Sequence, residues 1–128
     1  MAFVISGPHS QVSIDDLGAP ILELPERLEL ELPQFARIAE NFTSSFEVTG
    51  ADLRKMSDEV FRLLDKFRAF KESQLKSLGM VESDDPVVQA TVFDEIVRRN
   101  PVHAQLEAFL ACCKQAVAED GVLRCKGD

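Results

Sequence analysis

The most restrictive feature of this sequence is a long stretch of helical periodicity over residues 49–79. Large apolar residues recur there at alternating spacings of three and four, and a second apolar stripe lies beside the first. This spacing places apolar side chains on one face of an α-helix, whereas a strand would need alternation. The main stripe is Leu53, Met56, Val60, Leu63, Phe67 and Phe70, and the second is Phe61, Leu64, Leu75 and Leu78. So broad an apolar face predicts contact with more than one partner helix.

Three shorter stretches also have helical period. Phe35, Ile38, Phe42 and Phe46 predict an amphipathic helix that begins after Pro33. Asp85-Pro86 and Asn100-Pro101 each combine a capping residue with a proline suited to the first helical position. They predict two helices that meet at a tight corner, the second of which ends near Gly121.

These elements predict a mainly α fold. We expect a small bundle of about four helices over residues 34–121, preceded by an extended or partly β N-terminal arm over residues 1–33 and followed by a loose tail over 122–128. Four prolines interrupt the arm, which excludes a long helix there. Within it, two short apolar runs flank Gly7-Pro8-His9 in a pattern that predicts a loose hairpin.

Residues 26–32 are ambiguous. Leu28, Leu30 and Leu32 alternate with Glu29 and Glu31, which favours a strand with three leucines on one face and two carboxylates on the other. The alternative is a short helix from Pro25, with Leu28 and Leu32 four residues apart. A strand needs a pairing partner, which could be this chain or a second molecule. Residues 28–32 are therefore our candidate partner-binding segment.

Composition narrows the function. The 128 residues have a formal net charge of −8, which disfavours contact with nucleic acid and with anionic membranes. An odd number of cysteines, and the absence of a signal peptide or a long apolar segment, favour a cytoplasmic location. Charge is uneven: residues 1–48 carry −6, whereas residues 49–79 carry +2. We expect an acidic surface that suits a basic partner.

Few residues carry catalytic chemistry. His103 and Glu107 lie four apart on a predicted helix, but no third metal ligand accompanies them, so a surface histidine is the simpler interpretation. Cys112 and Cys113 are adjacent and cannot converge on one metal, because neighbours on a helix point about 100° apart. We expect Cys113 in the core, Cys112 half exposed, and Cys125 reactive beside Arg124 and Lys126. We assign no catalytic residue, metal or cofactor.

The sequence therefore favours a small, acidic, non-catalytic protein-binding module, such as an inhibitor, immunity factor, chaperone or assembly subunit. One alternative is a structural homo-oligomer built on the broad apolar face of residues 49–79. Another is a small-ligand binder or enzyme with a pocket between helices, for which His103 and Glu107 are the first candidates.

Overall fold

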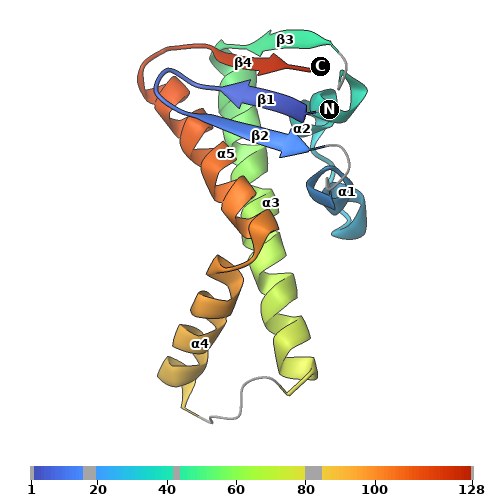
Figure 1. The fold of residues 1–128 in the computed structure, drawn as a ribbon, viewed down its shortest axis with the longest axis vertical. Coiled ribbons are helices and arrows are strands. Elements are labelled where there is room, and N and C mark those ends of the chain that lie inside the picture. Colours follow the sequence, from blue (N-terminus) through green and yellow to red (C-terminus); the bar gives the residue numbers. More distant parts are fainter. Residues whose placement is uncertain (1, 16–19, 42–43, 80–84, 128) are drawn as a thin grey trace.

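Five helices and a four-stranded antiparallel sheet form the described part of the chain (Figure 1). The computed structural model describes residues 2–15, 20–41, 44–79 and 85–127. The predicted mainly α fold is confirmed. In chain order the elements are β1 (Ala2–Ser6), β2 (Gln11–Asp15), α1 (Pro20–Arg27), α2 (Pro33–Glu40), β3 (Ser45–Val48), α3 (Gly50–Ser77), α4 (Pro86–Arg98), α5 (Pro101–Ala118) and β4 (Leu123–Lys126).

The sheet lies at one end of the molecule and joins the two ends of the chain (Figure 1). Its strand order is β2-β1-β4-β3, so the hairpin of β1 and β2 pairs with the C-terminal strand. Alternate residues of each strand enter the core, among them Ile5 of β1, Ile14 of β2 and Leu123 of β4. The predicted hairpin is confirmed. The loose tail is wrong for residues 123–126, because β4 is an inner strand whose alternating apolar residues are buried.

The turn of the hairpin packs closely against α5. A Cβ added at Gly7 would lie 3.1 Å from the carbonyl oxygen of Cys112, so glycine permits this approach. The hydroxyl of Ser10 donates to Gln115 Oε1 at 2.9 Å and lies 3.1 Å from the Cys112 Sγ. These contacts fix one edge of the sheet on the helix layer.

Helix α3 runs from the sheet to the far end of the molecule. Helix α5 packs against the first part of α3, and α4 packs against its last part (Figure 1). The starts of α4 and α5 follow the predicted signals. The Asp85 side chain accepts from the Val87 N–H, and that of Asn100 accepts from the Val102 and His103 N–H groups. Gly79 follows α3 with a φ of +66°, a conformation that favours glycine. The α4–α5 corner is therefore as the sequence predicted.

The segment before α3 differs from the prediction. Residues 20–27 form helix α1, and Glu29 takes a φ of +57° in the turn that follows, so residues 26–32 are not a strand. The alternation of leucine and glutamate instead reflects a helix end and a turn that bury Leu28 and Leu32. Helix α2 ends at Glu40, and Phe46 lies in β3; Phe42 lies outside the described residues. The sequence spacing of four from Ile38 to Phe42 and Phe46 continues past the end of α2, so the pattern predicted one continuous helix where the structure has a helix followed by a strand.

One buried carboxylate joins α2 to α3. Helix α2 begins at Pro33 after Leu32, a residue whose side chain cannot accept hydrogen bonds. Glu59 of α3, only 6% exposed, replaces a conventional cap: its Oε2 accepts from the Gln34 N–H at 3.2 Å and its Oε1 from the Phe35 N–H at 2.9 Å. The positive end of the α2 dipole further stabilises the carboxylate there.

Candidate functional site

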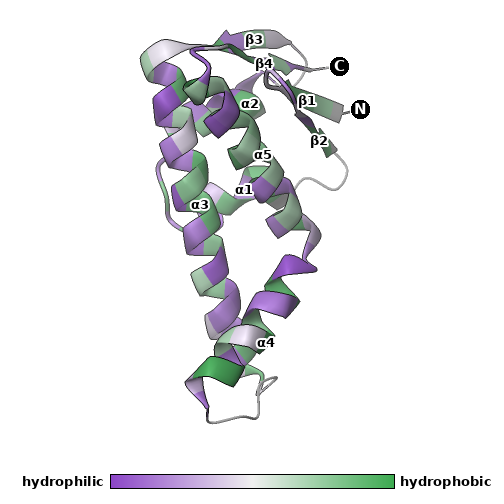
Figure 2. Ribbon diagram, turned by 90° about the vertical axis from the view of Figure 1, so that its left-hand side faces the viewer, coloured by the Kyte–Doolittle hydropathy of each residue, from purple (hydrophilic) through white to green (hydrophobic). Residues whose placement is uncertain are grey.

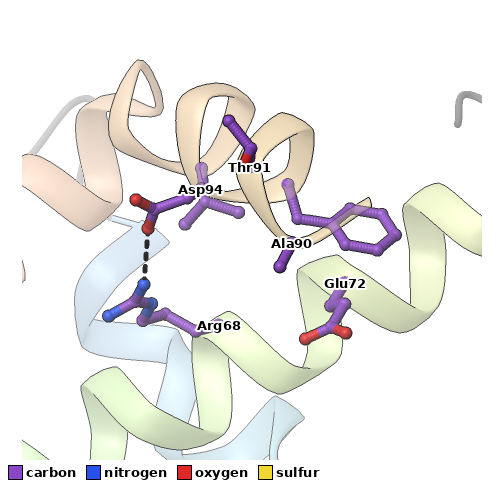
Figure 3. Close-up of a pocket in the computed structure, with 7 residues that line it drawn as sticks. Arg68, Glu72, Ala90, Thr91 and Asp94 are labelled. Atoms are coloured by element: carbon purple, nitrogen blue, oxygen red, sulfur yellow. Dashed lines mark hydrogen bonds and ion pairs between the residues drawn. The ribbon is translucent and has the colours of Figure 1, made fainter. Parts of the chain in front are cut away.

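Two hollows in the helical part of the molecule are candidate sites. The first is a cleft between α3 and α4 with a volume of about 470 Å³ (Figure 3). Its lining combines charged and apolar side chains from the two helices, namely Arg68, Glu72, Ala90, Thr91, Phe93, Asp94 and Val97. We call it the α3–α4 cleft.

The polar groups of the α3–α4 cleft are engaged with one another. Asp94 accepts from Arg68 at 2.8 Å through Oδ1 and from Arg98 at 2.8 Å through Oδ2 (Figure 3 draws the first of these). The hydroxyl of Thr91 donates to the Val87 carbonyl oxygen at 2.9 Å within its own helix. Each carboxylate oxygen of Asp94 is thus held by a guanidinium group of the same chain. This arrangement fits an interhelical ion network better than a reaction centre.

His103 lies at the start of α5 and is 1% exposed, so the prediction of a surface histidine is wrong. Its Nδ1 lies 3.1 Å from Oε1 of Glu107, as the four-residue spacing allows. Burial lowers the pKa of His103, which the Glu107 carboxylate opposes, so the ring is neutral at neutral pH. Its Nε2 has no hydrogen-bond partner among the described residues. Because the ring is enclosed and lines neither hollow, this geometry does not present His103 to a substrate.

The three thiols are all buried. Cys113 is in the core as predicted, whereas Cys112, expected to be half exposed, is also fully enclosed. The prediction that Cys125 is reactive is wrong, because it points into the core from β4 while its basic neighbours point outward. Burial raises the pKa of the Cys125 thiol to about 12, against a smaller lowering by Arg37. The thiolate that a nucleophile needs is therefore absent.

The second candidate is an apolar groove where α1, α3 and the α4–α5 corner meet. Its deeper part has a volume of about 280 Å³, and an adjoining shallower part of about 370 Å³ shares Arg27, Leu28 and Phe70 with it. The deeper part is lined by Leu24, Arg27, Leu28, Phe67, Phe70, Lys71, Asn100 and Val102, and the shallower part by Arg27, Leu28, Glu29, Lys66, Ala69, Phe70 and Ser73. We call the two together the Phe70 groove.

The Phe70 groove has a buried apolar floor and an accessible aromatic wall. Leu24, Leu28 and Phe67 are almost fully buried and belong to the main core, whereas Phe70 is 49% exposed. A large apolar side chain left accessible beside a hollow is typical of a binding surface, since isolated exposed residues are common but grooved apolar patches are not. Positively charged side chains from α1 and α3 border this wall.

The predicted partner-binding residues 28–32 fall into three different environments. Leu28 contributes to the floor of the Phe70 groove, and Glu29 lies at its edge. Glu31 is exposed and lines neither part of the groove, while Leu30 is half-buried and Leu32 belongs to the core. The structure therefore brings only Leu28 and Glu29 of this segment into a candidate site.

The residues that sequence reasoning missed are those of the groove wall. Phe70 and Phe67 both belong to the main apolar stripe of residues 49–79, which predicts contact with partner helices for both. The helical period assigns both to neighbouring parts of one face, but it does not reveal where the covering elements end. Across the described ranges, no three His, Cys, Asp or Glu side chains gather as a metal site would need, and no helix is long and apolar enough to cross a membrane.

No protein-family model, curated protein or solved structure matches this chain.

Proposed function

We propose that this chain is a non-catalytic protein-binding module, and that the Phe70 groove holds a segment of its partner. The observation that carries the proposal is the half-exposed Phe70 beside an apolar hollow of about 280 Å³. That volume lies near the lower limit of small-molecule and cofactor sites, and its apolar lining suits the anchoring side chain of a protein segment.

The scaffold supports this role. The floor of the groove is part of the hydrophobic core, so Leu24, Leu28 and Phe67 hold its shape without a ligand. A preformed groove reduces the entropy that binding would otherwise cost. Aromatic side chains at the centre of such a surface contribute a large share of binding energy in known interfaces.

Phe61 provides a matched control for a test of this proposal. It is a second exposed phenylalanine of α3, at 54%, and it lines neither part of the groove. Nine residues separate Phe61 from Phe70, and at about 100° per residue they lie on opposite faces of the helix. Replacing either side chain with glutamate therefore makes the same chemical change on opposite sides of α3.

The test is affinity capture from the source cell with wild type, Phe70→Glu and Phe61→Glu, followed by purification of each captured protein and calorimetric measurement of its affinity. We expect a stoichiometric partner whose affinity falls at least tenfold with Phe70→Glu and is kept with Phe61→Glu. Circular dichroism confirms that both variants are folded. A partner equally affected by both variants, or by neither, would refute the assignment to the groove.

Homo-oligomerisation is the second candidate, and a separate observation favours it. Leu78, Val87 and Val88 are exposed at the end of the molecule opposite the sheet, where Figure 2 shows hydrophobic residues at the start of α4. Sedimentation equilibrium over a wide concentration range tests this alternative. A mass that stays monomeric throughout removes it, whereas a dimer that Val87→Glu dissociates supports it.

A further inference from the structure

We infer that the occupant of the Phe70 groove is an acidic amphipathic segment of a partner protein, in which a large apolar residue is flanked by Asp or Glu. The inference rests on the proposed function and identifies the chemistry of the partner. It departs from the basic partner that the overall charge of the chain suggested.

The charge of the groove is opposite in sign to that of the whole chain. The chain has a net charge of −8, yet the groove is lined by three basic side chains and one acidic one, namely Arg27, Lys66, Lys71 and Glu29. A local excess of positive charge repels basic segments and attracts acidic ones, even though the protein as a whole is acidic.

The basic side chains of the groove are only weakly engaged within the described chain. Arg27 lies 3.0 Å from Glu23, but both side chains are about two-thirds exposed, so this pair contributes little and can exchange partners. In the described parts of the chain, neither Lys66 nor Lys71 forms an ion pair. Lys71 lies 3.3 Å from Gln74 Oε1 and 5.7 Å from the centre of the Phe67 ring, which holds its ammonium group beside the apolar floor.

On the α3 side of the groove, basic side chains border the aromatic ones. At about 100° per residue, the side chains follow the order Lys66, Phe70, Phe67, Lys71 around the helix over about 140°. The two phenylalanines thus lie in the middle of the α3 side of the groove, with one lysine at each border. A segment that places an apolar side chain against the rings brings its neighbouring residues to the two ammonium groups. Carboxylates on both sides of the anchor match this arrangement.

An anionic membrane surface shares part of this chemistry but fits less well. The anchor site is a hollow enclosed between three elements rather than a convex apolar face. The net charge of −8 also opposes approach to an anionic bilayer. A protein segment is the occupant that both the shape and the charge favour.

The test is a selection from a displayed library of random 16-residue peptides on the full chain, with counter-selection on Phe70→Glu. We expect the enriched peptides to share a large apolar residue flanked by Asp or Glu. In fluorescence anisotropy, the best peptide should bind at least tenfold more weakly to Lys66→Glu/Lys71→Glu. It should bind Lys114→Glu, an exposed charge reversal on α5 outside the groove, with nearly unchanged affinity. A copy of the peptide with lysine in place of its acidic residues should bind the double variant better than wild type.

The outcomes separate the two proposals. Phe70-dependent peptides that are neutral or basic would overturn the acidic occupant while supporting the groove as a binding site. Enrichment of no Phe70-dependent peptide would overturn the groove assignment itself. Phe70-dependent binding to phosphatidylserine vesicles, without enriched peptides, would replace the protein partner with a membrane surface.

Discussion

The carboxylate of Glu59 provides the sharpest test of how this fold is stabilised. Proline at the first position of α2 has no N–H, so Gln34 and Phe35 carry the first donors of this helix that lack a carbonyl one turn earlier. Both donate to the carboxylate of Glu59, which is enclosed between α2 and α3. Replacing Glu59 with alanine removes both acceptors at once and leaves two N–H groups near the core without a partner.

The size of the effect follows from these two hydrogen bonds. A hydrogen bond to a charged group contributes about 1.5–3 kcal/mol, so Glu59→Ala should reduce the free energy of unfolding by about 3 kcal/mol even at the lower limit. Glu59→Gln keeps one neutral oxygen acceptor but places an amide donor toward the second N–H. We expect it to cost about 2 kcal/mol at the same lower limit, because one charged-acceptor bond is lost and the other is weakened to a neutral bond of about 1 kcal/mol.

Urea denaturation followed by far-ultraviolet circular dichroism measures these differences. Glu72→Ala is the control, since Glu72 is an exposed residue of the same helix and should change stability by no more than about 0.5 kcal/mol. A loss below about 1 kcal/mol for Glu59→Ala would refute the capping role. Equal losses for Glu59→Ala and Glu59→Gln would also refute it, because the oxygen that glutamine retains should still accept one of the two hydrogen bonds.

Three further predictions concern the sheet, the thiols and the buried histidine. Gly7→Ala should lower the free energy of unfolding by about 1–3 kcal/mol in urea denaturation, since its Cβ would crowd the Cys112 carbonyl oxygen and that backbone cannot easily shift. An unchanged free energy of unfolding would show that the turn can move away from α5. In a thiol-reagent titration, Cys113 and Cys125 should react only on unfolding, because burial raises both pKa values. Burial lowers the pKa of His103 in the folded state, so the unfolded state binds the proton first as the pH falls. The free energy of unfolding should therefore decrease as the pH is lowered from about 7.5 to about 5.5, through the ordinary histidine pKa, and His103→Leu should flatten this dependence.

The helical half of the fold was largely predictable because its signals are local. The capping pairs at Asp85 and Asn100 act within one turn, and the structure places both helices where those pairs indicate. The sheet was less accessible, since β1 pairs with β4 across almost the whole chain. In the five residues after Gly121, apolar and basic residues alternate only briefly. This segment forms a strand because β1 and β3 pair with it on both sides.

The candidate site was less predictable than the fold, for a related reason. Leu28 and Leu32 were selected for their alternation with glutamates, but burial depends on the turn at Glu29, whose positive φ no local pattern signalled. Phe67 and Phe70 have the same chemistry and lie three residues apart, yet one is buried and the other half exposed. The difference in exposure depends on where α1 ends and where the α4–α5 corner packs against α3. Both depend on tertiary packing, which a local sequence pattern does not reveal.

The exposure of Phe70 is a consequence of how a long helix is covered by shorter ones. Helix α3 has 28 residues and is about 42 Å long, whereas α4 and α5 each cover only part of it. Their corner falls opposite the middle of α3, and Asn100 and Val102 of that corner form one end of the Phe70 groove. The cap that starts α5 therefore also shapes the groove, because Asn100 accepts from the Val102 N–H at 2.9 Å. Because the floor of the groove at this corner belongs to the hydrophobic core, the shape of the groove depends on the same packing that stabilises the fold.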